Sequence, residues 1–484
     1  MLPIPRRHYE RLYIGGDWVT PSDSGDIAVV NSTTEKHFGW VPSGSADDVE
    51  KATRAAEGAL PWMSEMSMRE RGDALDRIAD GIEARAHEIA TIVSQEVGTP
   101  IEQSLEWQAK QPVTVTRLYA EMSRAYKGDR TLGNSLVVRD PVGVVACITP
   151  WNFPLHQIML KVAPALAAGC SVVLKPSGLA PLTAFILAEV IGQAGLPAGA
   201  FNLVSGPGSS VGEALATSPR VDMVSFTGST NAGQGVAALA GESMKRLMLE
   251  LGGKSASLVL EDADLEEAVS SSVHNCYANA GQTCAAWTRL LVPRGLLIRA
   301  EAIAAETAEG YVLGDPLDPA TTMGPLVSPQ QRDAVRGFIA IGVDQGARLV
   351  TGGVDPPRGL NRGYFVRPTV FSNVGPEMAI ARQEIFGPVL AIQPYDTIDE
   401  AVRLANDSIY GLSGAVWSAD PKRALAIARR IQTGQVFING AAFNYLAPFG
   451  GYKHSGVGRE FGEYGLEEYM ELKAIQLTAS AAAS

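Results

Sequence analysis

The sequence predicts an α/β protein with two doubly wound parallel-sheet domains and a small β arm. Apolar runs of strand length alternate with helical stretches over residues 142–251, and the loops between them are short. A second alternation of the same kind continues to residue 439. The 484 residues are also too many for one compact core, so two or three domains are expected.

The N-terminal part is predicted to be mainly helical. Residues 12–19 have the pattern of a strand that ends in a turn. Residues 47–59, 68–97 and 101–121 are expected to be helical, because their apolar residues recur three to four positions apart.

A polar segment with two glycines, residues 126–139, interrupts this pattern and ends in the apolar run 135–138. It predicts a β-ribbon arm for subunit contact, and an ordinary surface hairpin is an equally good interpretation. Residues 474–478 are predicted to form a strand that pairs with the arm, in the same or another subunit.

Continuous apolar runs in the first alternation are typical of parallel strands that are buried on both faces. Its predicted strands are residues 142–148, 171–174, 201–204, 223–226 and 245–251, and its predicted helices are residues 156–168, 181–194, 209–217 and 231–240. A helix is predicted at residues 264–278, before Cys284. The second alternation follows Cys284 and contains predicted helices at residues 330–345, 398–405 and 421–432, and predicted strands at residues 289–292, 412–417 and 435–438.

Composition excludes several classes of function. A net charge of −12, spread along the chain, argues against nucleic acid or an anionic membrane as a partner. Residues 1–10 lack the apolar run of a secretory signal, and no run is long enough to span a bilayer. Four scattered cysteines are no disulfide framework, which favours a cytoplasmic protein. The six histidines form no metal-binding set, so no metal is expected.

Polar or glycine-rich turns follow four strands of the first alternation. Because ligands bind beyond the carboxyl ends of parallel strands, these turns predict a dinucleotide site in which helix N-termini face the diphosphate. Each glycine alone could equally mark a tight turn, and the spacing G-x-G-x-x-x-G is a weak signal. The turns contain Thr149, Pro150, Trp151 and Asn152, then Lys175 and Ser177, then Gly208 and Gly212, then Gly228 and Ser229 after Phe226.

Two further residues suggest catalysis. Cys284 lies in a turn after a helix that Gly281 is expected to end, where a thiol can be both placed and reached, although most free cysteines are simply small buried hydrophobes. Glu250 closes an apolar strand, so burial should raise its pKa and suit it to act as a general base. The alternative for Glu250 is an acid on an edge strand that points to water.

Seven motifs, in order along the chain, resemble the signatures of the aldehyde dehydrogenase superfamily. The resemblance extends from about residue 12 to residue 478, and the set is far more specific than any one motif. The motifs are PWNFP at residues 150–154, KPS at 175–177, FTGS at 226–229, ELGGK at 250–254, GQTC at 281–284, EIFGP at 384–388 and PFGG at 448–451.

The resemblance implies a hydrolytic, NAD(P)-dependent aldehyde oxidation. The Cys284 thiolate would attack the aldehyde, and the Asn152 amide with the backbone amide of Cys284 would hold the oxyanion. Glu250 would activate the water that hydrolyses the thioester. Lys161 and Glu460 match positions that assist proton release in some members of the family.

The resemblance also assigns the cofactor and the substrate sites. Lys175 would bind the adenosine ribose, Gly208, Gly212 and Ser229 would flank the diphosphate, and Glu384 would bind the nicotinamide ribose beside Phe386, with Leu251 near them. Gly178 replaces an acid that many NAD-preferring members carry, so NADP is possible, but NAD is favoured because no extra cation stands beside Ser177. The predicted substrate tunnel, mostly apolar, favours aliphatic, terpenoid or aromatic aldehydes and is lined by Phe153, Gln157, Leu160, Thr283, Ala285, Phe443 and Phe449.

The predicted organisation is a Rossmann-like cofactor domain, a catalytic domain and an oligomerisation element with a substrate-anchoring loop, in a homodimer or homotetramer. The cofactor domain comprises residues 1–123 and 140–251, and the catalytic domain comprises residues 252–435. The oligomerisation element comprises residues 124–139 and 436–484. Three alternatives are weaker. A CoA-acylating enzyme would not need Glu250 to activate water. A non-redox cysteine hydrolase would not need Glu384 and the cofactor motifs. A non-catalytic relative would not be expected to retain Cys284, Glu250 and Asn152 together.

Overall fold

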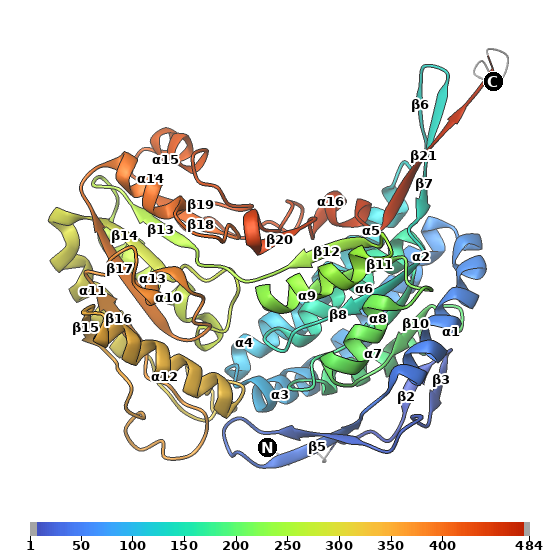
Figure 1. The fold of residues 1–484 in the computed structure, drawn as a ribbon, viewed down its shortest axis with the longest axis horizontal. Helices are drawn as coiled ribbons and strands as arrows, with labels where there is room; N and C mark the ends of the chain where they lie inside the picture. The colour runs from blue at the N-terminus through green and yellow to red at the C-terminus, as the bar shows by residue number, and fades with distance from the viewer. Residues whose placement is uncertain (1–6, 479–484) are drawn as a thin grey trace.

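Two α/β lobes lie side by side, and a β ribbon projects from one of them (Figure 1). This arrangement comes from a computed structural model that describes residues 7–478. Residues 1–6 and 479–484 lie outside the described part. Residues 1–6 belong to the stretch 1–10, whose lack of an apolar run argued against a secretory signal. None of the helices that the structure describes combines the length and the apolar character needed to cross a membrane.

The first lobe is built on an eight-stranded sheet with the strand order β20-β12-β11-β8-β9-β10-β2-β3. Its five central strands are parallel, as predicted, and antiparallel strands flank them at both edges. The parallel strands are β8 (Val144–Ile148), β9 (Ser171–Lys175), β10 (Phe201–Leu203), β11 (Met223–Thr227) and β12 (Arg246–Glu250), and the flanking strands are β2 (Leu12–Ile14), β3 (Asp17–Val19) and β20 (Gly456–Val457).

Helices cover both faces of this sheet, because successive strand residues point to opposite sides. Val145 and Cys147 pack on one face, and Val144 and Ala146 pack on the other. The first face is covered by α2 (Met68–Ala84), α3 (Ala86–Val97), α5 (Gln111–Ala125), α6 (Pro154–Ala168) and α7 (Leu182–Ile191), and the second by α1 (Ala46–Glu65), α8 (Glu213–Thr217) and α9 (Thr230–Gly241).

Three predicted elements of this lobe are wrong in detail. Residues 12–19 form the hairpin β2–β3, because Gly15 and Gly16 take positive φ angles of 65° and 89° and reverse the chain. The helix expected over residues 68–97 breaks at Arg85, which leaves the helical conformation and bonds Glu88 at 2.8 Å. Helix 101–121 consists of α4 (Ile101–Leu105), a π-helical turn (Glu106–Lys110) and α5.

The second lobe contains a seven-stranded sheet with the order β15-β16-β17-β14-β13-β18-β19, in which only β15, at one edge, is antiparallel. Its strands are β13 (Ala256–Val259), β14 (Arg289–Pro293), β15 (Arg348–Thr351), β16 (Thr369–Ser372), β17 (Val389–Tyr395), β18 (Gly414–Trp417) and β19 (Phe437–Ile438). One face packs on α10 (Leu265–Tyr277), α11 (Leu297–Glu309), α12 (Pro329–Asp344) and α13 (Ala379–Arg382), and the other on α14 (Ile398–Asn406) and α15 (Pro421–Ala428).

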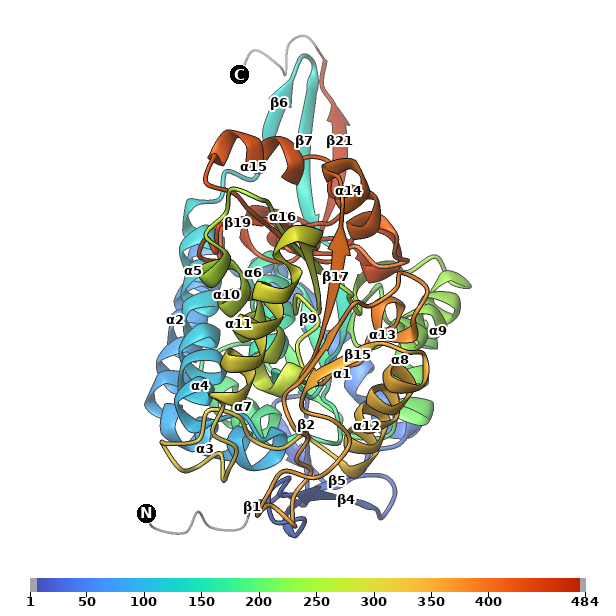
Figure 2. The same ribbon diagram turned by 90° about the vertical axis from the view of Figure 1, so that its left-hand side faces the viewer.

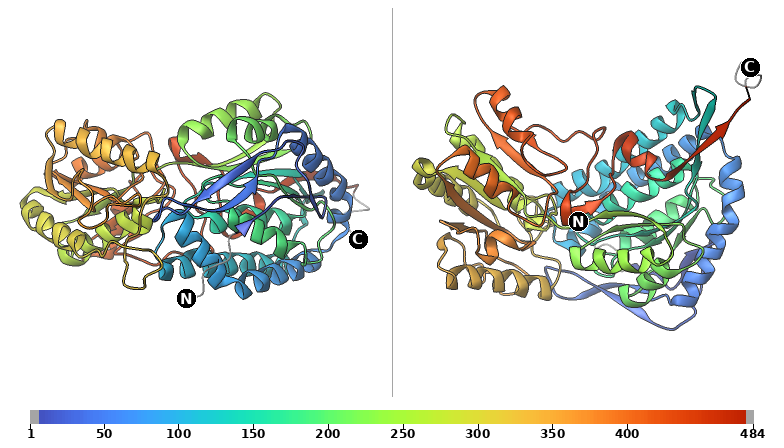
Figure 3. Two further views of the ribbon diagram at one scale, coloured as in Figure 1. Left: turned by 90° about the horizontal axis from the view of Figure 1, so that it is seen from below. Right: turned by 45° about the horizontal axis from the view of Figure 1, so that its top comes forward.

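The chain beyond residue 435 contributes a strand to each of the two large sheets. β19 pairs with β18 in the second lobe, and β20 pairs with β12 in the first, at the junction of the lobes in Figure 1. Figure 3 shows the same junction from below and from a tilted view. The C-terminal segment therefore connects the two lobes instead of belonging to the arm alone.

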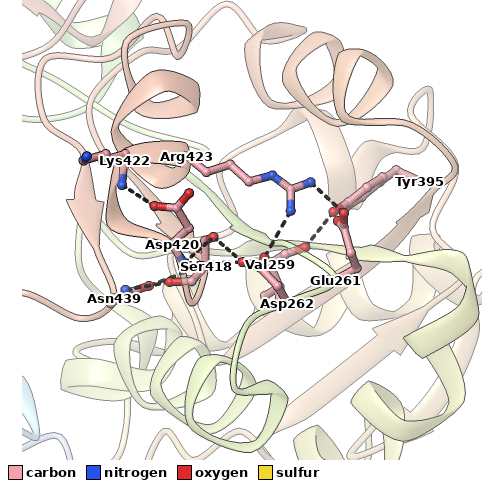
Figure 4. A network of polar contacts seen from close by, with 9 residues as sticks. All are labelled: Val259, Glu261, Asp262, Tyr395, Ser418, Asp420, Lys422, Arg423 and Asn439. Carbon is pink, nitrogen blue, oxygen red and sulfur yellow. Dashed lines mark hydrogen bonds and ion pairs between the residues drawn. The ribbon is translucent and has the colours of Figure 1, made fainter.

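A polar network fixes the place where the chain leaves β19 (Figure 4). The Asn439 amide accepts from the backbone N–H of Ser418 at 3.0 Å and donates to its carbonyl at 2.9 Å. The Ser418 hydroxyl donates to Asp262, and Arg423 bonds Glu261 at 2.6 Å. This network anchors the start of the loop 440–447, which contains Phe443 of the predicted substrate tunnel.

The projecting ribbon consists of β6 (Arg130–Leu132), β7 (Ser135–Pro141) and β21 (Met470–Gln476), and it extends beyond the helices in Figures 1 and 2. β21 pairs antiparallel with β7 of the same chain, with Ile475 opposite Leu136, which confirms the predicted pairing. The helix α16 (Gly462–Glu467) precedes β21. A three-stranded sheet of β1 (Arg7–His8), β4 (Asp26–Val30) and β5 (His37–Pro42) was not predicted.

Candidate active site

The segment before Cys284 is a left-handed turn. α10 ends at Tyr277, so the prediction that Gly281 ends this helix is wrong. Asn279, Ala280 and Gly281 follow with φ angles of 54°, 56° and 76°. A left-handed conformation costs a residue with a side chain roughly 1–3 kcal/mol, so the surrounding structure must hold this turn in place.

Hydrogen bonds from the first lobe hold it. Asn152, between β8 and α6, donates through Nδ2 to the Gln282 carbonyl at 3.0 Å, and Asn279 Nδ2 donates to the Asn152 carbonyl at 2.9 Å. Thr99 donates to the Asn279 side chain at 2.6 Å. Gln282 accepts from the backbone N–H of Val327 at 2.9 Å. The turn is thereby fixed by both lobes, and the position of Cys284 relative to Asn152 is set.

Two cavities, of about 210 and 330 Å³, meet at Cys284. Cys284 is half-buried and lines both of them, as does Gln157 from α6. One cavity lies on the side of the predicted cofactor turns, and the other on the side of the predicted substrate residues. A group held in one cavity can therefore meet a group held in the other at the thiol.

The first cavity contains about half of the predicted cofactor residues. Those that line it are Pro150, Trp151, Gly228, Ser229, Leu251, Glu384 and Phe386. Phe226 lies in the core below this edge, where its ring would clash with any side chain at position 228. Lys175 and Gly212 adjoin each other farther along the sheet, because a Cβ at Gly212 would lie 3.8 Å from the Lys175 side chain. The first cavity is also lined by Thr227, Gly252 and Gln331.

Polar groups in the first cavity and on the neighbouring strand ends fit a dinucleotide. The hydroxyl groups of Thr149 and Thr227 are buried and have no protein partner within residues 7–478. Glu384 accepts from the backbone N–H of Gly253 at 3.0 Å, and burial raises the pKa of its carboxyl to about 7. Burial also lowers the pKa of Lys175, whose Nζ donates to the Pro176 carbonyl at 2.9 Å, to about 8.

The second cavity contains all seven predicted substrate residues: Phe153, Gln157, Leu160, Thr283, Ala285, Phe443 and Phe449. Sequence reasoning missed the other aromatic rings that line it, which are Trp107, Trp287, Phe437, Tyr445 and Phe461. Trp107 is placed by the π-helical turn, which apolar periodicity did not indicate. Tyr445 and Phe461 could have been suspected from the aromatic residues that recur from 443 to 461.

Burial raises the pKa of the Cys284 thiol to about 12, and the carboxyl groups of Glu250, Glu384 and Glu460 add to this shift. Cys284 is therefore a protonated thiol at neutral pH and needs a base to become a nucleophile. Within residues 7–478, the backbone amide of Cys284 donates to no protein acceptor, so it is free to bind an oxyanion.

Glu250 is buried at the end of β12, and both of its carboxyl oxygens lack a hydrogen-bond partner within residues 7–478. Burial, followed by repulsion from Glu460, raises its pKa well above the ordinary value. The alternative of an acid that points to water is wrong. Glu460 itself forms a fully buried ion pair of 2.7 Å with Lys161. Across the described residues, no three His, Cys, Asp or Glu side chains are grouped to hold a metal ion.

Comparison with known proteins identifies the family of this site. The family model described as "Aldehyde dehydrogenase family" matches residues 18–475. A 3-succinoylsemialdehyde-pyridine dehydrogenase of Pseudomonas sp is 47% identical, over 97% of this chain and 98% of its own length.

Solved structures of the same family superimpose on nearly the whole chain. A variant of aldehyde dehydrogenase C from Pseudomonas syringae, in complex with NAD+ and octanal, has a TM-score of 0.96 and 46% identity, covering 98% of this chain and 97% of that one. An aldehyde dehydrogenase of Mycobacterium tuberculosis, complexed with NAD+, has a TM-score of 0.95 and 41% identity, covering 98% of this chain and 99% of that one.

The left-handed turn generates a prediction about Gly281. A Cβ there would clash with the backbone carbonyl of Gly387, in addition to the strain of its positive φ. Gly281→Ala should lower the free energy of unfolding by about 2 kcal/mol or more and reduce turnover, as measured by urea unfolding and initial rates. Gly346→Ala is the matched control, because Gly346 has a φ of 85° with open space around it. Equal effects of the two substitutions would contradict the role of this contact.

Proposed function

Because the chain belongs to the aldehyde dehydrogenase family and oxidises an aldehyde with NAD, we propose that Cys284 is the nucleophile of that reaction and Glu250 its base. The observation that carries this proposal is the position of Cys284, where the two cavities meet. The neighbouring Asn152 side chain and the free backbone amide of Cys284 supply donors for the oxyanion.

The first half of the mechanism forms a covalent bond to sulfur. The Glu250 carboxylate accepts the thiol proton, and Cys284 Sγ attacks the aldehyde carbon. The carbonyl electron pair moves onto oxygen, where an Asn152 N–H and the backbone N–H of Cys284 stabilise it. When bound, NAD supplies the acceptor for the hydride that this carbon loses, and a thioester to Cys284 remains.

The second half releases the acid. Glu250 first releases the thiol proton to solvent and then takes a proton from water, whose oxygen attacks the thioester carbon. The C–S bond then breaks, and the sulfur takes up a proton as the carboxylate product leaves. A carboxyl whose pKa is raised by burial is suited to exchange protons near neutral pH. The charges of the buried Lys161–Glu460 pair act on the pKa of Glu250, so this pair would assist proton release.

Residues of the first cavity would hold NAD. Glu384 would accept hydrogen bonds from the nicotinamide ribose, and Phe386, edge-on to Trp151 at 5.4 Å, would pack near the ring. Ser229 caps the N-terminus of α9, whose amide groups would face the diphosphate, with Gly208 and Gly212 beside it. Lys175 and Ser177 would bind the adenosine ribose. Gly178 leaves room there, since even a Cβ at this position would make only ordinary contacts with Ile27, so NADP could also be accommodated.

An uncharged aldehyde is the proposed substrate class. The described residues that line the second cavity include no Lys, Arg, Asp or Glu, and most are aromatic or apolar. The octanal in complex with aldehyde dehydrogenase C and the pyridine-bearing semialdehyde in the name of the Pseudomonas relative are both consistent with such a cavity. Hydrolysis by Glu250 favours a carboxylate product over an acyl-CoA.

The same proposal includes a cytoplasmic homo-oligomer with the predicted division into a cofactor domain, a catalytic domain and an oligomerisation element. The ribbon supports it, because Leu132, Leu472 and Ile475 are 49%, 68% and 41% exposed on a projecting sheet. Apolar side chains in such a place are typical of subunit contact. The extension of the C-terminal segment into both lobes makes residue 435 an approximate boundary of the catalytic domain.

Replacing the nucleophile tests the central assignment. Cys284→Ala should lower NADH formation from octanal at least about a thousandfold while calorimetry still detects NAD binding, because only the bond to the aldehyde carbon is lost. Cys276→Ala is the control, since Cys276 is buried in the second lobe outside both cavities. Turnover that survives in Cys284→Ala would refute the assignment.

The pH dependence tests the base. Glu250 accepts protons only when it is ionised, so kcat should fall as the pH drops through its raised pKa. Glu250→Gln should lower kcat about a hundredfold or more and remove this acidic limb from the pH–rate profile. Glu65→Gln, a control at an exposed residue at the end of α1, should retain the limb. An unchanged acidic limb in Glu250→Gln would assign the titration to another group.

The oligomeric state tests the role of the ribbon. We expect the wild-type chain to be a dimer or tetramer by light scattering, and Leu472→Asp to shift it toward monomers, because the charge would have to be buried. Leu425→Asp on α15 is the matched control, with Leu425 47% exposed away from the ribbon. A monomeric wild-type chain would contradict the assignment.

A further inference from the structure

Phe461, between Glu460 and the short helix α16, has a backbone conformation that few residues other than glycine adopt. Its φ and ψ angles are 65° and 155°, where a residue with a Cβ is strained. Such a residue persists only where the surrounding structure holds it, and these residues are concentrated at functional sites. Since glycine would avoid the strain, the phenylalanine indicates that its ring has a role.

The backbone on both sides of Phe461 is fixed. Glu460 exchanges two backbone hydrogen bonds with Phe449, of 2.9 and 2.7 Å, and its carboxylate pairs with the buried Lys161 at 2.7 Å. The carbonyl of Phe461 accepts from the backbone N–H of Gly465 at 2.9 Å. The ring of Phe461 therefore starts from a fixed backbone, among the residues that line the second cavity.

Four other rings of the second cavity contact the ring of Phe461, which is only 3% exposed. The ring centroid of Phe461 lies 5.2 Å from that of Phe443, 5.7 Å from that of Tyr445, and 6.1 Å from those of Phe449 and His156. Aromatic pairs at such distances attract each other beyond the effect of their burial. Phe461 is therefore the common contact of four residues that line the cavity.

The loop 440–447 contributes two of these rings and has few other attachments. Within the described part of the chain, no hydrogen bond connects residues 442–447 to another segment. Their two hydrogen bonds are internal, because Asn444 accepts from the backbone N–H groups of Leu446 and Ala447. Beyond its ends, the loop must be held by side-chain packing.

That packing is on Phe461 and the residue after it. The rings of Phe443 and Tyr445 turn inward onto Phe461, while Leu446 is 61% exposed. Gly462 lies against the loop as well, because a Cβ there would meet the Leu446 carbonyl at 2.2 Å. The conformation of Phe461 and Gly462 thus brings backbone and ring together under the loop.

We propose that Phe461 is a positioning residue of the second cavity. Its ring holds Phe443 and Tyr445, and through them the loop 440–447, in the place that sets the affinity for the aldehyde and the size of aldehyde accepted. This inference rests on the proposed function, in which the aldehyde binds in this cavity. Phe461 lines neither the first cavity nor the thiol itself, so its effect should appear with the aldehyde and not with NAD.

Phe461→Leu tests the ring, because it removes the aromatic contacts and keeps an apolar side chain in place. We expect the KM for octanal to rise about tenfold, while kcat and the KM for NAD change less than about threefold. The ratio of kcat/KM for 3,3-diphenylpropanal to that for octanal should rise about tenfold, because a loosened loop can move aside for the bulkier aldehyde.

Phe185→Leu is the matched control. Phe185 is fully buried in another aromatic cluster, with Tyr9 and Trp18 at centroid distances of 4.7 and 6.2 Å, and it lines neither cavity. It should keep the wild-type KM for octanal and the wild-type size preference even if it melts at a lower temperature. Equal kinetic changes in the two leucine variants would overturn the proposal.

Phe461→Gly separates the backbone from the ring. Glycine takes the positive φ angle without strain, so this variant keeps the backbone path and loses only the ring. We expect it to show at least the rise in the KM for octanal that Phe461→Leu shows. A wild-type KM and size preference in Phe461→Gly would overturn the proposal and leave Phe461 as ordinary core.

Limited digestion with chymotrypsin follows the loop without turnover. With NAD present, cleavage after Tyr445 or Leu446, detected by mass spectrometry, should be about tenfold faster in Phe461→Leu than in the wild type and unchanged in Phe185→Leu. Equal cleavage rates in all three proteins would overturn the proposal, whatever their activity. Absence of wild-type turnover with every aldehyde would instead refute the proposed function, while faster cleavage in Phe461→Leu would still support the positioning of the loop.

Discussion

The hydrogen bonds between Asn152 and the turn before Cys284 are the constraint on which the rest of the site depends. Asn152 belongs to the first lobe and the turn to the second, and each contributes one bond of about 3 Å. Without them, the left-handed residues Asn279 and Ala280 would relax toward ordinary conformations. The same bonds place an amide donor and the thiol around one point, so the lobes assemble the site by packing together.

The electrostatics of the site explain why a cysteine and a glutamate occur together. Burial and the surrounding carboxyl groups keep Cys284 protonated, which protects the thiol when no base acts on it. Burial also makes Glu250 a stronger base than a surface acid. The ion pair of Lys161 and Glu460 brings a positive and a negative charge together near Glu250 and limits the net charge of this buried region.

The second cavity is assembled from segments that are remote in the sequence. Trp107 comes from a π-helical turn, Trp287 from the loop after Cys284, and Phe443 from the loop anchored by the Asn439 network (Figure 4). Aromatic rings from all of these segments line this wall. The scaffold and the catalytic pair can therefore stay fixed while the wall residues set the preference among aldehydes.

The sequence by itself determined the alternating α/β pattern, because burial leaves a local periodic signal. It also contained seven motifs whose resemblance to a known family implied the roles expected of Cys284 and Glu250. Only the tertiary structure decided that Gly281 closes a left-handed turn instead of a helix, that β19 and β20 join different sheets, and that Trp107, Trp287 and Phe437 line one cavity. Those features arise from contacts between distant segments, for which local spacing carries no signal.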